Sequence, residues 1–431
     1  MSPVLGLSLR SIANRRLSVA LTVIAVALAV ALLTGVERVR TDARAGFAQT
    51  ISGTDLVVGA RSGPVQLLLY SVFHLGNATN NVSWASIEHV AALPQVKWLV
   101  PIALGDSHRG HRVIGTRAAF FEHYRHGEGQ ALVFAKGRSF ADAPEQVAGL
   151  FEVVIGAEVA VRHGYRIGQQ IVLSHGSLGG EGGPRFADHA DKPFTIVGIL
   201  ARSGTPVDRA LLVSLEAIEA IHVDWHGGAP IPGVKIAPEH VRKFDLQPKS
   251  ATAALVGLDS RTAVFRVQRQ INTYPGEALT AILPGATLQE LWGLVGVAEK
   301  ALLAVSALVV AVGLAGMVAM VVASLGERRR ELAILRALGA SPGQVFALLA
   351  VESALLALAG IALGLALLYG AGALVSPWLA AEHGLQLSLG WPRAGEWRLL
   401  GAVLAASLIA SLVPALRAYR YSLADGMSVR V

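Results

Sequence analysis

Three groups of residues in this sequence have types and spacings that could do chemistry. The first is a charged segment between two apolar stretches, residues 327–344, which reads ERRRELAILRALGASPGQ. Its apolar positions recur at helical spacing: Leu332, Leu335 and Leu338. Glu331 and Arg336 lie among them, and Gly339 and Pro342 follow. The spacing predicts a short amphipathic helix that ends at these last two residues. Such a helix is suited to docking onto a partner.

The alternative for this segment is a solvated loop whose arginines only set the orientation of the neighbouring helices. We favour docking, because the leucines give the helix an apolar edge while Glu331 and Arg336 offer polar contacts. Arg328–Arg330 fit docking and the anchoring of lipid phosphates equally well.

The second group lies inside the apolar stretches. Glu352 is the only acid within one of them, and we expect it to pair with a nearby arginine of the charged segment. A proton-relay role is the alternative. Four glycines at close spacing are predicted to permit close helix packing, either within the chain or across a dimer: Gly313, Gly316, Gly360 and Gly364.

Histidines form the third group. Twelve of the thirteen lie between His74 and His240. Three pairs have spacings of three or four, which could place two imidazoles on one helical face as zinc sites require: His108/His111, His123/His126 and His222/His226. Arg109-Gly110 is typical of a turn, however, and the chain has no cysteine. We therefore predict locally hydrogen-bonded or surface histidines and no metal, with a metal-linked or pH-sensitive role as the alternative.

Motifs for catalysis are absent from the sequence. It contains no His-Glu-x-x-His and no Gly-x-x-x-x-Gly-Lys-[Ser/Thr] phosphate loop. Residues 177–181 superficially resemble an ABC signature loop, and we interpret this as coincidence. The chain is therefore predicted not to be an enzyme, with no catalytic residue and no cofactor of its own.

The elements that must position these residues are membrane helices. A mean hydropathy of +0.52, with 53% hydrophobic and 16% charged residues, is outside ordinary soluble composition. Four stretches reach the ~20 apolar residues that a span needs. The first is too long for the core of a secretory signal and is followed by a poor cleavage site, so we predict a retained anchor.

Orientation follows from the positions of the basic residues. Residues 37–300 hold 25 Lys and Arg against 24 Asp and Glu, so most of the net charge of +7 lies in the short segments. Short basic segments stay in the cytoplasm. The pI of about 9.8 therefore reports topology and gives no support for nucleic-acid binding. The absence of cysteine excludes disulfides, and we expect a bacterial inner membrane with the large domain in the periplasm.

The predicted order of segments is a cytoplasmic N-terminus (1–16), a first span (17–36), a periplasmic domain with helical stalks at both ends (37–300), a second span (301–325), a cytoplasmic loop (326–344), a third span (345–373), a short periplasmic loop (374–398), a fourth span (399–416) and a cytoplasmic C-terminus (417–431). Within the large domain, residues 65–72 suit a core strand or a short buried helix, and 83–93 suit a helix capped by Ser83. Short strands with glycine turns lie between α/β-like segments, and 176–184 is a glycine-rich loop. The fold class is thus four membrane helices with a split α/β domain that contains an inserted β-rich part.

This layout, with ERRRELAILRALGAS after the second span, resembles the FtsX-like permeases. Three segments of the large domain are similar to the branch of the macrolide exporter MacB and the lipoprotein-releasing Lol permeases: 152–156 (EVVIG), 164–171 and 194–198 (FTIVG). The glycine-rich loop is outside this resemblance. MacB carries its ATPase on the same polypeptide and this chain does not, so the separate-subunit Lol arrangement is the nearer one.

The resemblance implies how such a chain would work. Residues 331–338 would be the coupling helix that contacts a separate ABC ATPase, present in two copies, which binds ATP and Mg²⁺. The permease would act as a homodimer or as a heterodimer with a second permease, in contact with membrane lipids and possible periplasmic accessory proteins. Export or extrusion of lipoprotein, peptide or drug-like substrates is the expected function. The alternatives are a non-transporting regulator of a periplasmic partner such as a cell-wall hydrolase, and a component of a metal-linked transport system.

Overall fold

The computed structural model describes residues 16–142, 146–176, 187–226, 229–327, 334, 336–383 and 388–420. The chain divides into two compact units. The helical unit comprises Met1–Ala43, Val295–Ala380 and Leu385–Val431, and the α/β unit comprises Arg44–Leu294 and Ala381–Gly384.

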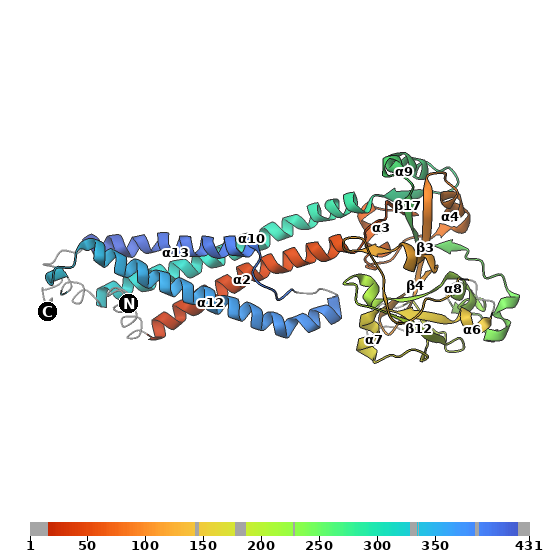
Figure 1. The fold of residues 1–431 in the computed structure, drawn as a ribbon, viewed down its shortest axis with the longest axis horizontal. Helices are drawn as coiled ribbons and strands as arrows, with labels where there is room; N and C mark the ends of the chain where they lie inside the picture. The colour runs from red at the N-terminus through yellow and green to blue at the C-terminus, as the bar shows by residue number, and fades with distance from the viewer. Residues whose placement is uncertain are drawn as a thin grey trace. The chain divides into compact units, whose positions relative to one another are not determined.

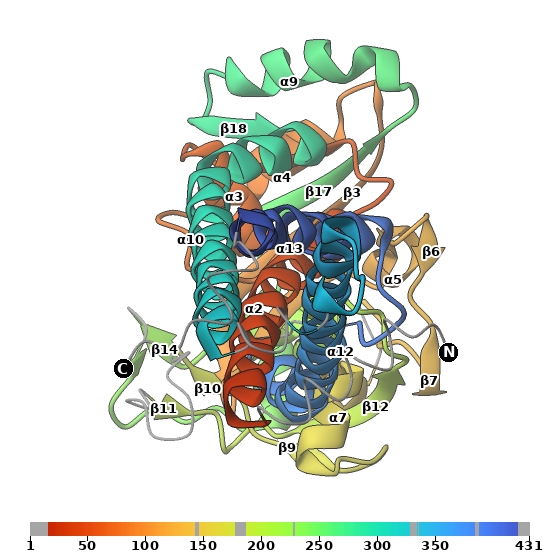
Figure 2. The same cartoon turned by 90° about the vertical axis from the view of Figure 1, so that its left-hand side faces the viewer.

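Four long helices make up the described part of the helical unit: α2 (Arg16–Gln49), α10 (Pro284–Glu327), α12 (Pro342–His383) and α13 (Ala394–Arg420). Each is long and apolar enough to cross a membrane. They lie side by side in both views (Figures 1 and 2). Val26, Val30 and Leu33 of α2 are buried against α13, so α2 supplies much of the centre of this bundle.

The helices extend beyond the predicted spans. The predicted stalks at 37–50 and 287–300 belong to α2 and α10, which continue as helices through them. The predicted loop at 374–398 is shorter than expected, because α12 continues to His383 and α13 begins at Ala394. Pro377 removes one backbone hydrogen bond from α12, but the leucine and alanine residues around it are strong helix formers.

The α/β unit is built on a twelve-stranded sheet. Its main path runs in the order β18 (Leu279–Ile282), β1 (Leu56–Ala60), β17 (Ala253–Leu258), β3 (Val96–His108), β4 (His111–Thr116), β13 (Leu211–Ser214), β8 (Glu152–Ile155), β12 (Phe194–Leu200) and β7 (Phe134–Gly137). β9 (Gln170–Ile171), β10 (Ser174–His175) and β11 (Ala187–Asp188) join at its edges.

The long strand β3 joins two parts of this unit. Its first half pairs with β17, and its second half pairs with β4 and β10. The register shifts between Leu104 and Ser107, where the strand passes from one part to the other. The chain leaves the first part along β3 and returns to it in β17, so the predicted α/β part with an inserted β-rich part is confirmed.

Short helices cover the sheet: α3 (Pro64–Ser71), α4 (Trp84–Ala91), α5 (Ala119–His123), α6 (Val147–Leu150), α7 (Ala157–His163), α8 (Leu215–Ile221) and α9 (Val264–Asn272). Ser83 caps α4 as predicted, since its hydroxyl accepts the Ser86 N–H. The remaining elements are β2 (Val82–Ser83), β5 (Arg125–His126), β6 (Gln130–Ala131), β14 (Trp225–His226), β15 (Ala229–Pro230), β16 (Ser250–Ala251) and 3₁₀ turns at Pro206–Arg209, Pro238–Lys243 and Arg261–Ala263.

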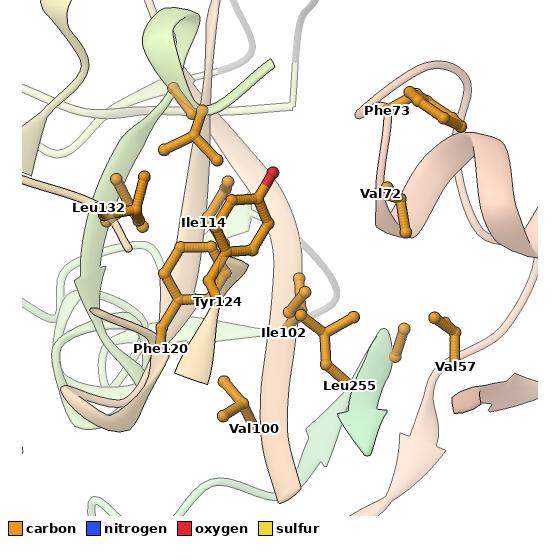
Figure 3. Close-up of a cluster of buried hydrophobic side chains, with 14 of the residues drawn as sticks. Val57, Val72, Phe73, Val100, Ile102, Ile114, Phe120, Tyr124, Leu132 and Leu255 are labelled. Atoms are coloured by element: carbon orange, nitrogen blue, oxygen red, sulfur yellow. The ribbon is translucent and has the colours of Figure 1, made fainter. Parts of the chain in front are cut away.

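Residues 65–72 form the buried helix of the two predicted options. Leu67 of α3 lies directly over Gly59 of β1, where a Cβ would come within 2.6 Å of the leucine. The core beneath the sheet includes the stacked rings of Phe120 and Tyr124, 4.9 Å apart, with Ile102 nearby (Figure 3). The predicted glycine-rich loop at 176–184 lies, apart from Gly176, outside the described residues.

Candidate functional site

The end of the predicted docking segment is described in the structure. Leu338 N–H donates to the Ile334 carbonyl (2.9 Å) and Gly339 N–H to the Arg336 carbonyl (3.0 Å), which is the end of a helical turn. Gly339 has φ +100°, a conformation that favours glycine, so it ends the turn as predicted. Ser341 and Gln344 exchange hydrogen bonds that cap the start of α12.

The apolar side chains of this turn face solvent in the single chain. Leu338 is 80% exposed and Ile334 is 52% exposed, whereas Arg336 is half-buried and has an interaction partner. Ile334 was not among the predicted contacts, although its position four residues before Leu338 could have indicated it. The other predicted contacts, Glu331, Leu332 and Leu335, lie outside the described residues.

The predicted glycine pair of α12 lies against α2 of the same chain. A Cβ on Gly360 would come within 2.6 Å of Val26, and one on Gly364 within 2.7 Å of the Ala27 carbonyl oxygen. Glycine therefore allows the two helix backbones to approach more closely than a side chain would permit. Within the single chain, Gly360 and Gly364 thus pack against α2, and packing across a dimer stays a prediction.

The glycines of α10 are placed differently. The nearest atom to a Cβ on Gly313 is the Ala25 carbonyl oxygen, at an ordinary 3.6 Å. A Cβ on Gly316 would meet no atom within 4 Å among the described residues. Neither glycine is required for close packing within the described part of the chain.

A buried ion pair joins the first and last helices of the bundle. Arg38 of α2 donates from Nε to Glu396 Oε1 (2.9 Å) and from Nη2 to Oε2 (2.7 Å). Its guanidinium carbon also lies 5.0 Å from the centre of the Tyr369 ring of α12. Both charged side chains are almost fully buried. The pair was not predicted, because 358 residues separate its members.

A second polar contact lies one turn further along α2. Asp42 accepts the Ser388 N–H (2.9 Å) and pairs with Arg393, in the connection between α12 and α13. Together, the two contacts tie this end of α2 to the other helices by directional, charge-assisted bonds.

The helical extensions α2 and α10 contact each other beyond the bundle. Arg40 lies 3.9 Å from Glu299 in the helical unit. In the α/β unit, Phe47 packs edge-on against Trp292, with ring centres 5.5 Å apart, and Arg44 lies over the same indole. Phe47 and Leu288 also pack against the core of that unit. The two predicted stalks thus brace each other.

Glu352 is buried in α12, with 5% of its surface exposed, and it has an interaction partner. It was expected to pair with a nearby arginine of the charged segment, of which Arg336 is described and Arg328–Arg330 are not. Its predicted pairing therefore stays a prediction.

The histidine pairs of the sequence do not act as pairs. His108 and His111 flank a two-residue turn in which Arg109 and Gly110 both have positive φ, as predicted. Each is locally hydrogen-bonded: His108 contacts the Tyr165 hydroxyl (2.7 Å), and His111 Nδ1 donates to the Arg209 carbonyl (3.0 Å).

Burial lowers the pKa of His111 to about 4. The opposite ring nitrogen of His111 lies 3.0 Å from His163 Nε2, and electrostatic repulsion from His163 lowers the pKa of His111 further.

The other two pairs each have a member with a different neighbour. His123 stacks on Trp98 at 4.8 Å. His222 lies beside three residues that other elements supply: Asp106, His175 and His189. Neither His175 nor His189 belongs to a pair with helical spacing, so sequence spacing carried no signal for this grouping.

Comparison with known protein families finds matches over most of the chain. Residues 19–274 match the MacB-like periplasmic core domain, and residues 303–423 match the FtsX-like permease C-terminal region. No curated protein sequence matches the chain.

Two solved structures are similar in part. The periplasmic region of MacB from Actinobacillus actinomycetemcomitans matches at 10% identity and a TM-score of 0.32, over 56% of this chain and 94% of that one. The extracellular domain of the noncanonic ABC-type transporter YknZ from Gram-positive bacteria matches at 11% identity and a TM-score of 0.30, over 53% and 98%.

The family assignment depends on the two sequence matches, of which the first alone covers more than half of the chain. The four long apolar helices agree with it. The chain is therefore a multi-pass membrane protein that belongs to the FtsX-like, MacB-like family of ABC transporter permeases.

Proposed function

We propose that this chain is the membrane subunit of an ABC transporter and that a separate ATPase subunit docks on the turn before α12. The observation that carries the proposal is the exposed apolar pair Ile334 and Leu338 between two membrane helices. An exposed leucine on a short polar connection costs solvation free energy unless a partner covers it. The sequence offers no phosphate loop, so ATP and Mg²⁺ are assigned to the partner and no cofactor to this chain.

Mechanical transmission is the mechanism that these contacts favour. Movement of the turn displaces α10 and α12, between which it lies. Gly360 and Gly364 couple α12 closely to α2, and Arg38–Glu396 couples α2 to α13. Since α2 and α10 continue without a break into the α/β unit, displacement in the helices reaches that unit.

We propose export or extrusion of lipoprotein, peptide or drug-like substrates across or from a bacterial inner membrane, with both termini in the cytoplasm and the α/β unit in the periplasm. Two copies of the ATPase would serve two permease chains, either identical or paired with a second permease. The burial of the apolar helices supports a dimer. Within the chain, only 22% of the most apolar segment of α10 is buried, against 44% of the corresponding segment of α12. The exposed surface of α10 is available to a second chain or to lipid.

Docking is tested by Leu338→Asp in the full chain, reconstituted in nanodiscs with its partner ABC ATPase. Because Leu338 is 80% exposed, the variant should fold and insert normally. We expect loss of ATPase binding and of the ATPase stimulation that the permease provides. Val161→Asp, at an 83% exposed position in the α/β unit, is the matched control. Normal binding by Leu338→Asp would overturn the docking assignment.

A further inference from the structure

Four ligand-type side chains meet inside the α/β unit, whereas the proposed docking turn belongs to the helical unit. They come from separate elements: Asp106 from β3, His175 from β10, His189 from the turn after β11, and His222 from the end of α8. One nitrogen or oxygen atom from each lies within 4.8 Å of all the others. Asp106 is buried, and His189 is completely buried.

The distances match the edges of a zinc coordination tetrahedron. Zinc bonds of about 2.0–2.1 Å to nitrogen and oxygen place neighbouring ligand atoms about 3.3 Å apart. Asp106 Oδ1 lies 3.1 Å from His175 Nδ1, 3.7 Å from His222 Nε2 and 3.9 Å from His189 Nε2. His175 Nδ1 and His222 Nε2 are 3.1 Å apart. Small side-chain adjustments would bring all four atoms onto one ion.

Hydrogen bonds within the described residues satisfy only some of the polar atoms in this cluster. His189 is completely buried, yet neither of its ring nitrogens has a hydrogen-bond partner among the described residues. A buried polar group without a partner destabilises the folded chain. A metal ion beside Asp106 would satisfy Nε2 of His189, which no described protein group does.

The surroundings orient the ligands. His222 Nδ1 donates to the Ile218 carbonyl (2.8 Å), which leaves its Nε2 lone pair free to bind a cation. The His189 carbonyl accepts the Lys192 N–H (3.1 Å), and the buried Lys192 ammonium is paired with Asp224 (2.9 Å). These contacts fix the turn that carries His189.

The site also has an apolar cover and an opening. The Trp225 ring lies 4.3 Å from that of His189 and 5.3 Å from that of His175, and so shields the cluster from water. A cavity of about 110 Å³ reaches Asp106, His175 and His222, which gives an ion a route to the ligands.

We propose that Asp106, His175, His189 and His222 form a binding site for Zn²⁺ or a similar divalent transition-metal ion. Three imidazoles and one carboxylate suit such ions better than Mg²⁺ or Ca²⁺, which prefer oxygen ligands alone. The bound ion would fasten the β10–β11 hairpin and the end of α8 to β3. The sequence predicted no metal, and this proposal replaces that prediction independently of the proposed ATPase coupling.

The test uses the full chain, purified in detergent with a tag that contains no histidine and stripped of metal with EDTA. Zn²⁺ titration by calorimetry should give one site per chain, and Co²⁺ should produce the visible absorption of tetrahedral coordination. His222→Gln and His175→Gln, at partly exposed positions, should each weaken binding by more than the roughly 10–100-fold that loss of an outer-shell partner costs. The exposed His226→Gln is the matched control and should bind like the wild type.

Thermal unfolding of the metal-free variants shows whether they fold. For any variant that does not, X-ray absorption of the zinc-loaded wild type decides the matter: three nitrogen ligands and one oxygen at about 2.0–2.1 Å support the site. The proposal is overturned if the wild type binds no Zn²⁺, if both folded variants bind as tightly as the wild type, or if His226→Gln loses binding equally.

Discussion

Arg38 and Glu396 place two opposite charges where water hardly reaches either of them. Removing one member of such a pair leaves the other charge buried alone, which costs about 3–5 kcal/mol, whereas replacing both with apolar residues can be neutral. We therefore expect Arg38→Met to lower the free energy of unfolding by that amount and the double change Arg38→Met/Glu396→Leu to recover most of it.

SDS-induced unfolding of the full chain in mixed micelles measures this difference. The bidentate pair Arg138–Glu152 is the control, since its arginine is 63% exposed. Arg138→Met should cost less than about 1 kcal/mol. Equal losses for Arg38→Met and Arg138→Met would show that burial of the first pair has no energetic consequence.

The buried imidazole of His111 makes stability depend on pH. Its pKa of about 4 in the folded chain lies below the ordinary value of about 6.5, because burial disfavours the charged form. The neutral ring is therefore fully compatible with folding above pH 6.5. As the pH falls from 6.5 toward 4, the free energy of unfolding decreases by up to about 3 kcal/mol.

Thermal unfolding of the full chain between pH 7 and pH 4.5 checks this dependence. The variant His111→Gln should show a shallower loss of stability on acidification than the wild type. His240→Asn, at an exposed histidine, is the control and should follow the wild-type curve. An unchanged slope in His111→Gln would contradict the assignment.

Single residues were predictable from the sequence only where their effect is local. Gly339 ends its turn as the glycine pattern indicated, and Ser83 caps its helix. The Arg38–Glu396 pair and the proposed metal ligands join residues from distant parts of the chain, so they depend on tertiary packing that local patterns do not encode.

Among the elements, the contact between α2 and α12 is the tightest constraint that we identify in the bundle. A methyl group on Gly364 would come within 2.7 Å of the Ala27 carbonyl oxygen and 2.9 Å of Val30. Gly364→Ala should therefore separate the helices and cost about 1–3 kcal/mol, as overpacking does.

Gly316→Ala is the matched control, because its added methyl meets no described atom within 4 Å. It should leave the midpoint of SDS unfolding unchanged or raise it slightly, since alanine favours helix more than glycine does. If both variants shift the midpoint equally, the α2–α12 contact does not limit stability.

At this scale, the sequence predicted the four helices well, because long apolar stretches can hardly form anything else in a membrane. It left residues 65–72 open between strand and helix, since a short apolar stretch suits both. It also missed that β3 continues through both parts of the sheet. Which partner each half of β3 takes also depends on β17 and β10, which come much later in the chain, whereas β4 follows directly.

For the whole molecule, the segment order followed from hydropathy and charge, and the family matches agree with the resemblance that its motifs carried. The identity of the substrate and of the partners depends on surfaces that other chains contribute, so this sequence alone does not give it. The central claim is that nucleotide binding by the ATPase is transmitted through the helices to the α/β unit.

That claim is tested most directly by distance measurements between spin labels in a reconstituted complex that contains two copies of this chain. The chain has no cysteine, so Val161→Cys at its exposed position gives one label per permease. We predict that the label–label distance distribution differs between the ATP-bound and nucleotide-free states, and that Leu338→Asp abolishes the difference. An identical distribution in both states would contradict the account.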